Sequence, residues 1–267
     1  SGAAARRGAS CPSSADAARP SPTIADVDEP VVTEPRVCPL CRGFGRLERP
    51  DGSTIPCECR AEDIVRARRA AARIPERYRN CRLQNFKDLQ NESLKKAKAV
   101  AKRFVDHWPA VDAGLLITGP VGVGKTHLAV AILNELVDTK GASVLFCDFS
   151  DLLDRIQASF SRSNEENQDD IVAPYRDANL LVLDELGARR PSDWVREILY
   201  GLLNTRYNRG RITILTTNFS DEPDARGGET LETRIGAPVR SRLWEMTQLV
   251  SVSAEDFRKS HRAKAFG

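Results

Sequence analysis

The chain has 267 residues, of which 41% are hydrophobic, 29% charged and 6% aromatic, and its formal net charge is +3. This length accommodates one or two domains, and the apolar fraction is sufficient for a folded core. No apolar run approaches the roughly 18 residues of a membrane-spanning helix, so the sequence excludes a transmembrane protein. The small net charge permits an anionic partner without requiring one.

Residues 1–36 are rich in Ala, Ser, Pro and Arg and contain almost no large apolar side chain. Such a segment cannot bury enough surface to offset the entropy lost on ordering, which predicts a flexible tail. Arg6 and Arg7 in an acid-poor start leave a targeting peptide as the alternative, although the apolar stretch of a secretory signal is missing.

Residues 37–60 form a compact unit with two close pairs of cysteines. The cysteines are Cys38, Cys41, Cys57 and Cys59. Four thiolates in two pairs suit tetrahedral zinc, and a turn with Gly43 and Gly45 leaves N–H groups free to donate to the sulfurs. The second pair departs from the usual zinc pattern, because one residue separates its cysteines instead of two. The unit has too few apolar residues to bury reduced cysteines in a core, so we expect structural zinc.

Residues 61–82 are expected to form a basic helical linker. Seven arginines and three acidic residues occur between Arg60 and Arg79, and the Ala-rich first part favours a helix until Pro75. A solvated helix is the favoured interpretation, and a nucleic-acid contact is the alternative.

Residues 83–267 have the pattern of an α/β domain. Apolar side chains recur at helical spacing in its first segment. They are Leu94, Ala97, Ala101, Phe104, Val105 and Trp108. Four short apolar runs are then typical of buried strands, at residues 115–118, 144–147, 180–183 and 212–216. Because helical segments separate these runs, the sequence predicts a parallel central sheet flanked by helices.

A complete P-loop pattern lies between the first of these strands and the helix that follows. It comprises Gly119, Pro120, Val121, Gly122, Val123, Gly124, Lys125 and Thr126. The glycines let backbone N–H groups surround phosphate oxygens at the positive end of the helix. Lys125 then reaches the β- and γ-phosphates, and Thr126 offers a hydroxyl to Mg²⁺.

The ends of two later strands supply the other polar groups of a nucleotide site. Asp184 follows the strand at 180–183 and is expected to hold magnesium, while Glu185 polarises the attacking water. Asn218 follows the strand at 212–216, where it either orients that water or caps the strand. Magnesium-dependent hydrolysis of a nucleoside triphosphate is the predicted reaction.

These three strand ends, taken in order, resemble the Walker A, Walker B and sensor 1 motifs of AAA+ ATPases. From Ile74 onward the chain more closely resembles the DnaC/DnaI helicase loaders and their relative, the transposition helper IstB. The matching segments are Ile74-Pro-Glu-Arg-Tyr-Arg, Asn85-Phe86, the P-loop with His127-Leu-Ala, Leu180-Leu-Val-Leu-Asp-Glu-Leu-Gly, Thr216-Thr-Asn, Arg240-Ser-Arg-Leu and Ala254-Glu-Asp-Phe-Arg.

The resemblance implies that the nucleotide is ATP, that His127 lies at its site, and that copies associate through the ATP interface. In this family an arginine of a short motif reaches the ATP of the neighbouring subunit, and Arg242 matches that position. The earlier arginine of the motif falls on Pro238 here, which leaves open whether Arg240 or Arg234 assists Arg242.

The resemblance also implies partners. The loaders carry an extra helix between two strands that meets single-stranded DNA, and residues 150–173 occupy this place. Phe160 within them either stacks on a base or packs in the core. The cysteine unit resembles the domain with which DnaI-like loaders dock on the hexameric replicative helicase, although zinc units also bind DNA.

The first interpretation is a cytoplasmic, ATP-dependent loader of the replicative helicase that assembles on single-stranded DNA. The alternative is a transposition ATPase that organises target DNA for a transposase, which shares every nucleotide-site motif. IstB-type proteins generally lack the cysteine unit, so this unit favours the loader. A nucleotide-binding adaptor without hydrolysis is a third interpretation, and the intact Lys125, Asp184 and Glu185 argue against it.

Overall fold

The computed structural model describes residues 38–259 except Gly43, Asp51, Leu89 and the segments 161–166 and 224–227. The predicted tail at residues 1–36 therefore lies outside the described residues. Among the residues that are described, no helix has both the length and the apolar character needed to cross a membrane.

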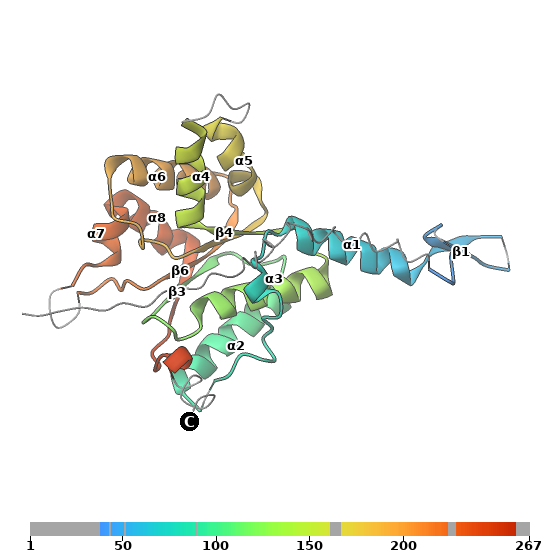
Figure 1. Cartoon of the computed structure of the whole chain (residues 1–267). Coiled ribbons are helices and arrows are strands. Elements are labelled where there is room, and N and C mark those ends of the chain that lie inside the picture. Colours follow the sequence, from blue (N-terminus) through green and yellow to red (C-terminus); the bar gives the residue numbers. More distant parts are fainter. Residues whose placement is uncertain are drawn as a thin grey trace, which may run out of the picture.

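Five parallel strands form the central sheet, in the order β4-β5-β6-β3-β7 (Figure 1). They are β3 (Gly114–Thr118), β4 (Val144–Asp148), β5 (Leu180–Asp184), β6 (Ile212–Thr217) and β7 (Thr247–Ser251). The predicted parallel sheet and its four predicted strands are confirmed. The apolar pattern does not reveal β7, because Val250 is its only buried residue and only Leu249 and Val250 are apolar.

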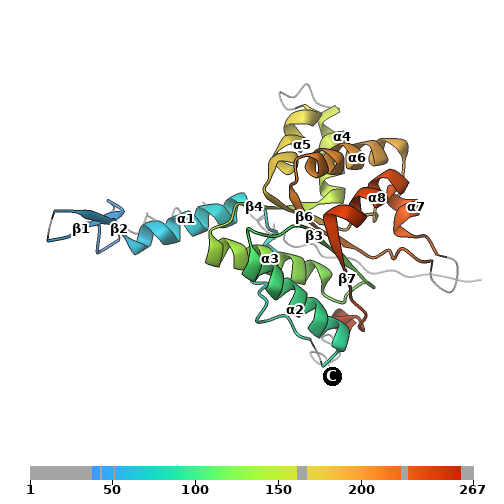
Figure 2. The same cartoon turned by 180° about the vertical axis from the view of Figure 1, so that it is seen from behind.

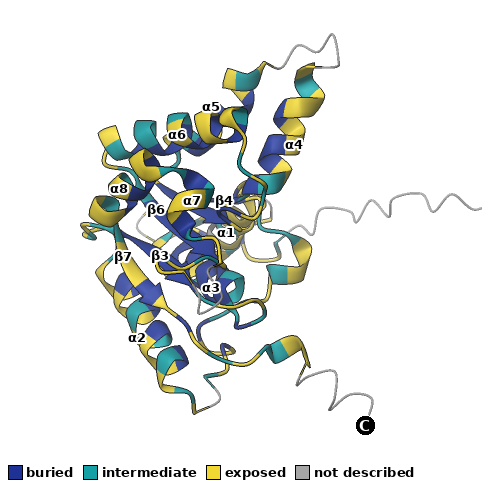
Figure 3. Cartoon of the chain, turned by 90° about the vertical axis from the view of Figure 1, so that its left-hand side faces the viewer, coloured by how far each residue is buried: buried dark blue, intermediate teal, exposed yellow. Residues whose placement is uncertain are grey.

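Helices cover both faces of the sheet (Figure 1, Figure 2). One face packs against α2 (Glu92–His107) and α3 (Lys125–Lys140), and the other against α4 (Phe149–Phe160), α5 (Gln168–Asp177), α6 (Asp193–Asn208), α7 (Leu231–Ile235) and α8 (Ala237–Met246). Side chains of a strand alternate between the two cores, as Ile117 of β3 joins the first and Leu116 the second. Figure 3 shows this buried interior along the sheet and the inner sides of the helices.

The predicted first helix of the domain is confirmed as α2. Its side chains Leu94, Ala97, Ala101, Phe104 and Val105 are buried. Asn91 caps its N-terminus by accepting from the N–H groups of Ser93 and Leu94. The insertion predicted between two strands consists of α4 and α5, which lie between β4 and β5 in the chain.

The N-terminal part of the described chain projects from the body as a small hairpin and a helix (Figure 1, Figure 2). The hairpin pairs β1 (Arg46–Glu48) with β2 (Thr54–Pro56), and α1 spans Glu58–Ala71. A 3₁₀ helix, η1 (Glu76–Tyr78), follows Pro75. The end of α1 is attached to the sheet, because Ala72 is buried and its carbonyl accepts from Phe146 N–H at 2.8 Å.

Candidate nucleotide-binding site

The carboxyl ends of three neighbouring strands meet at one edge of the sheet. The P-loop follows β3, Asp184 ends β5, and Asn218 follows β6, which lies between the other two strands. Lys125 Nζ donates to Asn218 Oδ1 at 2.6 Å, and Thr126 Oγ1 donates to Asp184 Oδ1 at 3.0 Å. Residues that are up to 93 positions apart in the sequence therefore share one site.

The P-loop lies directly against the C-terminal segment. A Cβ atom on Gly119 would lie 2.0 Å from the carbonyl oxygen of Val252, and one on Gly122 would lie 1.9 Å from Asp256 Oδ1. Both glycines have positive φ, of 149° and 82°. Phe257 N–H also donates to Gly122 O at 3.1 Å. At Gly119 a side chain would meet backbone atoms, and at Gly122 the positive φ favours glycine.

Lys125 is buried at the first turn of α3 and donates to three neutral acceptors. Besides Asn218, these are the carbonyl oxygens of Gly119 at 2.8 Å and Pro120 at 2.7 Å. Burial lowers the pKa of Lys125 to about 8, although the negative charges of Asp184 and Glu185 oppose this shift. Desolvation disfavours the ammonium form in the free protein. An anionic phosphate beside Nζ would favour that form, because a nearby opposite charge stabilises it.

Asp184 is buried at the end of β5 and accepts two hydroxyl hydrogen bonds. Its Oδ1 accepts from Thr126 and, at 2.5 Å, from Thr216 of β6. Burial raises the pKa of Asp184 to about 6, and the two hydroxyl hydrogen bonds oppose that rise. A carboxylate beside a hydroxyl provides hard oxygen ligands, which is the donor set that Mg²⁺ prefers. Thr126 and Asp184 therefore fit the predicted magnesium site.

Glu185 is exposed to the site and has a strained backbone. Its φ is +58°, in the left-handed region that residues other than glycine rarely adopt. Its N–H donates to Thr216 Oγ1 at 3.1 Å, and Thr216 O accepts from Leu186 N–H at 2.8 Å. Thr216 thus binds both acidic residues of the site. The sequence places Thr216 in a strand but gives no sign of this contact.

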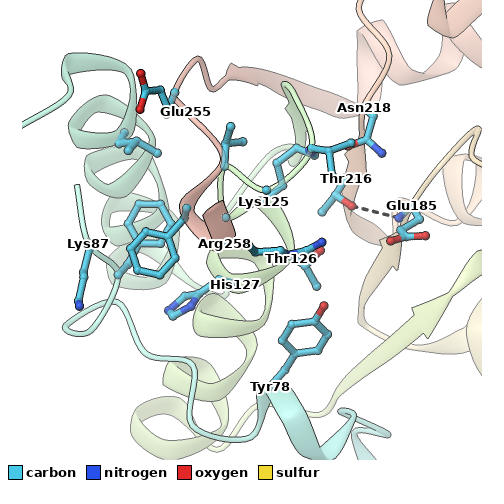
Figure 4. Close-up of a pocket in the computed structure, with 18 of the residues that line it drawn as sticks. Tyr78, Lys87, Lys125, Thr126, His127, Glu185, Thr216, Asn218, Glu255 and Arg258 are labelled. Atoms are coloured by element: carbon cyan, nitrogen blue, oxygen red, sulfur yellow. Dashed lines mark hydrogen bonds between the residues drawn. The ribbon is translucent and has the colours of Figure 1, made fainter. Parts of the chain in front are cut away.

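A cavity of about 440 Å³ extends from these groups along the start of α3. Figure 4 shows Glu185, Thr216 and Asn218 at one end of the cavity and Lys87 at the other, with Thr126 between them. This volume lies within the usual range for pockets that bind small molecules and cofactors. The end with Lys125 suits a triphosphate, and the remainder is available for a nucleoside.

The far part of the cavity has aromatic and apolar walls. Phe86, Leu94 and Phe257 line it, whereas Tyr78 lies near Thr126 (Figure 4). His127, which the sequence predicts at this site, also lines it and packs edge-on against Phe86, with ring centroids 5.6 Å apart. Burial lowers the pKa of His127 and so favours its neutral form. Flat apolar walls of this kind suit the faces of a purine base.

Sequence reasoning missed several of these cavity residues. Arg258 lines the cavity beside Phe257, and its positive charge contributes to lowering the pKa of Lys125. The motif Ala254-Glu-Asp-Phe-Arg carries the resemblance to the loaders, and that was the available signal for a contribution from this segment. Tyr78 lies within another matching segment, Ile74 to Arg79, which spacing alone does not link to the P-loop.

The three arginines considered for action across an interface lie away from this cavity. Arg240 is buried and forms an ion pair with Asp221, and Arg234 pairs with Glu229 at 3.4 Å. Arg242 is half-buried on α8 and forms no ion pair with a described residue. Arg242 thus differs from Arg240 and Arg234, because these two form ion pairs with carboxylates and Arg242 does not among the described residues.

Phe160 ends α4 with 63% of its side chain exposed, so it does not belong to the core. Its ring lies edge-on to Trp194 of α6, with ring centroids 6.4 Å apart. Three other apolar residues of this helix, Leu152, Leu153 and Ile156, are buried. An exposed aromatic ring at this end of α4 is free to stack on another ring.

The four predicted cysteines lie together beside the β1–β2 hairpin. All their Sγ atoms lie within 4.8 Å of one another, with Cys38 and Cys57 3.8 Å apart and Cys41 and Cys59 3.3 Å apart. Four sulfurs bonded to one zinc at about 2.3 Å would lie about 3.8 Å apart, so the cluster fits tetrahedral zinc. Gly45 N–H donates to Cys41 Sγ at 3.2 Å, as the sequence predicts. Cys59 lies in the first turn of α1, so the unit and the helix share this residue.

Comparison with known proteins places this geometry in a family. The family model of IstB-like ATP-binding proteins matches residues 59–265. The replicative helicase loader DnaC of Buchnera aphidicola (subspecies Schizaphis graminum) is 28% identical over 158 residues, which cover 59% of this chain and 62% of that protein. A putative ATP-binding protein of insertion sequence IS21 from Pseudomonas aeruginosa is 33% identical over 154 residues, which cover 57% of this chain and 54% of that protein.

A solved structure supports the same relationship. The crystal structure of the DnaC helicase loader is 33% identical and matches with a TM-score of 0.59, covering 67% of this chain and 99% of that one. The chain nevertheless spans only 54% to 62% of the length of the two curated relatives. The fold, the nucleotide motifs and the family model agree, and the chain belongs to the IstB-like ATP-binding proteins, the family that also includes the DnaC helicase loaders.

Proposed function

We propose that the chain binds ATP with Mg²⁺ and hydrolyses it. The observation that carries this proposal is the pair of contacts between the strand ends, Lys125 to Asn218 and Thr126 to Asp184. On binding, Lys125 exchanges its neutral acceptors for the β- and γ-phosphate oxygens. Magnesium, held by Thr126 and Asp184, would neutralise part of the phosphate charge.

Glu185 and Asn218 act on the water in this proposal. The strained backbone fixes Glu185 at the mouth of the site, where its carboxylate accepts a proton from the attacking water. The amide of Asn218 orients the same water or the γ-phosphate once Lys125 has turned to the nucleotide. The catalytic residues are therefore Lys125, Glu185 and Asn218, with Arg242 supplied by a second copy.

We infer that the biological role is loading of the replicative helicase. The relatives named DnaC are helicase loaders, and Cys38, Cys41 and Cys57 of the cysteine unit precede the residues that the IstB-like family model matches. In this proposal zinc holds residues 37–60 as a docking unit for a hexameric helicase, and residues 61–82 link it to the ATPase domain at 83–267. Phe160 contacts single-stranded DNA, and the protein acts in the cytoplasm.

A transposition helper is the second candidate. The family model bears the IstB name, and the Pseudomonas relative belongs to an insertion sequence. Co-purification with a hexameric helicase supports the loader. Filaments on duplex DNA that recruit a transposase support the helper.

The decisive test of hydrolysis compares wild type with Glu185→Gln, with and without single-stranded DNA. We expect the variant to bind ATP normally and to lose about 100-fold or more of its turnover, which is the usual contribution of a general base. Equal turnover in the two proteins would contradict an enzyme and would favour a nucleotide-binding adaptor.

A further inference from the structure

The three arginines of the C-terminal helices differ in the charge of their partners. Arg240 meets the carboxylate of Asp221, and Arg234 meets that of Glu229. Arg242 donates only to neutral oxygens among the described residues. No carboxylate of the residues that the structure describes forms an ion pair with it, and the nearby Glu245 accepts from the Tyr207 hydroxyl instead.

A neutral cradle on α6 holds the Arg242 side chain. Arg242 Nε donates to Asn204 Oδ1 at 2.9 Å, and Nη2 donates to the Tyr200 hydroxyl at 3.2 Å. Nη1 donates to the carbonyl of Pro238 at 2.8 Å. The guanidinium carbon also lies 4.9 Å from the centroid of the Tyr200 ring and 5.8 Å from that of Tyr207. Tyr200, Asn204 and Tyr207 recur at helical spacing on one side of α6.

The cradle orients the guanidinium and leaves part of it available. An arginine has five N–H donors, and three of them are used in the described contacts. Amide and hydroxyl acceptors fix the planar group without cancelling its charge, whereas a carboxylate in the same place would compete with any incoming anion.

Arg242 is not placed to bind the phosphates of a nucleotide in the cavity of its own chain. No residue of α6, α7 or α8 lines that cavity among the described residues. The flanking residues Val239 and Leu243 pack in the core on the opposite face of the sheet from α3 (Figure 1). In an assembly of this chain, a nucleotide bound to a second copy is the anion that Arg242 could contact.

We propose that Tyr200 and Asn204 are positioning residues, which hold Arg242 oriented and unneutralised toward the γ-phosphate of ATP on a second copy. This inference rests on the proposed function. It also assigns Arg240 and Arg234 to internal ion pairs, so that neither assists Arg242.

Asn204→Asp tests the charge of the cradle with almost no change of shape. The new carboxylate would pair with Arg242. We expect ATP turnover by the assembled protein on single-stranded DNA to fall at least tenfold, while the affinity for the nucleotide stays unchanged. Asn208→Asp is the matched control, because it adds the same charge one helical turn away on the exposed end of α6. We expect the control to retain wild-type turnover. Thermal unfolding of both variants checks that the fold is intact.

Mixing subunits separates a lost arginine from a damaged subunit. Glu185→Gln subunits have an inactive site and an intact Arg242, while Asn204→Asp subunits have an intact site and a neutralised Arg242. The mixture should turn over ATP faster than the two proteins measured separately. A mixture of Glu185→Gln with Lys125→Ala should show no such gain, because neither subunit has a working site.

The outcomes distinguish this inference from the proposed function. If Arg242→Ala loses stimulated turnover and Asn204→Asp keeps it, the cradle has no positioning role and the inference is wrong. If Asn204→Asp loses turnover but the mixture shows no gain, the variant damages its own site and the inference is also wrong. If Arg242→Ala keeps stimulated turnover, the proposed action of Arg242 across an interface fails first.

Discussion

The sheet body and the cysteine unit of this chain are stabilised by different interactions. The body, residues 72–259, buries apolar side chains on both faces of its sheet. In the unit, the buried described residues are Cys41 and Cys57, while Leu40 and Phe44 are 67% and 82% exposed. Hydrophobic burial therefore stabilises the body, and under the proposed function the unit depends on a zinc ion that the four sulfurs would hold.

The segment between the two regions reinforces this difference. No described residue of α1 is fully buried, and its contacts with the body include those of Val65 with the core and of Arg69 with Asp138, so we expect only weak coupling between the two regions. Loss of either region should leave the other folded. The following predictions test this independence, and they run from the largest expected effect to the smallest.

Removal of zinc should unfold the cysteine unit and leave the body intact. Binding of structural zinc supplies roughly 10 kcal/mol or more in small zinc modules, so the unit has nothing comparable to replace it. Hydrogen exchange of residues 38–57 should become fast after treatment with a zinc-selective chelator. Cys41→Ser should lose the metal, whereas Cys81→Ser, outside the cluster, should keep it. Loss of ATP binding on chelation would argue against independent regions.

Leu153→Ala should destabilise the body without releasing zinc. Leu153 is fully buried in the core under α4, and removal of such a side chain costs about 2 to 5 kcal/mol. Leu249→Ala is the control, because Leu249 is 43% exposed on β7 and its loss should change stability by less than about 0.5 kcal/mol. Denaturant unfolding and zinc content measure the two effects. A core variant that also loses zinc would show that the regions are coupled.

Asp184→Asn should stabilise the nucleotide-free protein. Burial raises the pKa of Asp184 from 3.8 to about 6, so its ionisation lowers stability as the pH rises from 3.8 to about 6, and the full cost remains at higher pH. At pH 7 the amide should therefore raise stability by on the order of 2 kcal/mol. Asp221→Asn should have the opposite effect, because it leaves Arg240 buried without its partner.

Thermal unfolding with and without ATP and Mg²⁺ measures this prediction. Wild type should gain stability from the ligands, and Asp184→Asn should gain much less because the magnesium ligand is missing. A nucleotide-free Asp184→Asn protein that is less stable than wild type would contradict the account of this buried carboxylate.

The sequence predicts the phosphate end of the site well, for a physical reason. Its residues follow apolar strands, and parallel strands place their carboxyl ends at one edge, so Lys125, Asp184 and Asn218 can be predicted to converge. The contribution of Thr216 is not visible, since it depends on which way a strand side chain points. The apolar end of the cavity is not visible in spacing either, because Phe86 and Phe257 come from segments far apart in the sequence that meet at the cavity only in the folded chain.

Other features required the structure for similar reasons. The strand β7 lies at the sheet edge and lacks a continuous apolar run. The contact of Arg242 with Asn204 spans 38 residues and joins two helices whose pairing no local pattern encodes. The β1–β2 hairpin was not predicted, although Pro50-Asp51-Gly52 is a typical turn sequence between short extended segments.

The convergence of the three strand ends on a nucleotide can be measured directly by calorimetric titration of ATP with Mg²⁺ into wild type, Lys125→Ala and Lys102→Ala. We expect saturable binding to one site per chain in wild type and in the exposed Lys102→Ala control, and an affinity at least 100-fold lower in Lys125→Ala. Absence of binding heat in wild type, or equal affinity in the Lys125→Ala variant, would contradict the assignment of this edge of the sheet to a nucleoside triphosphate.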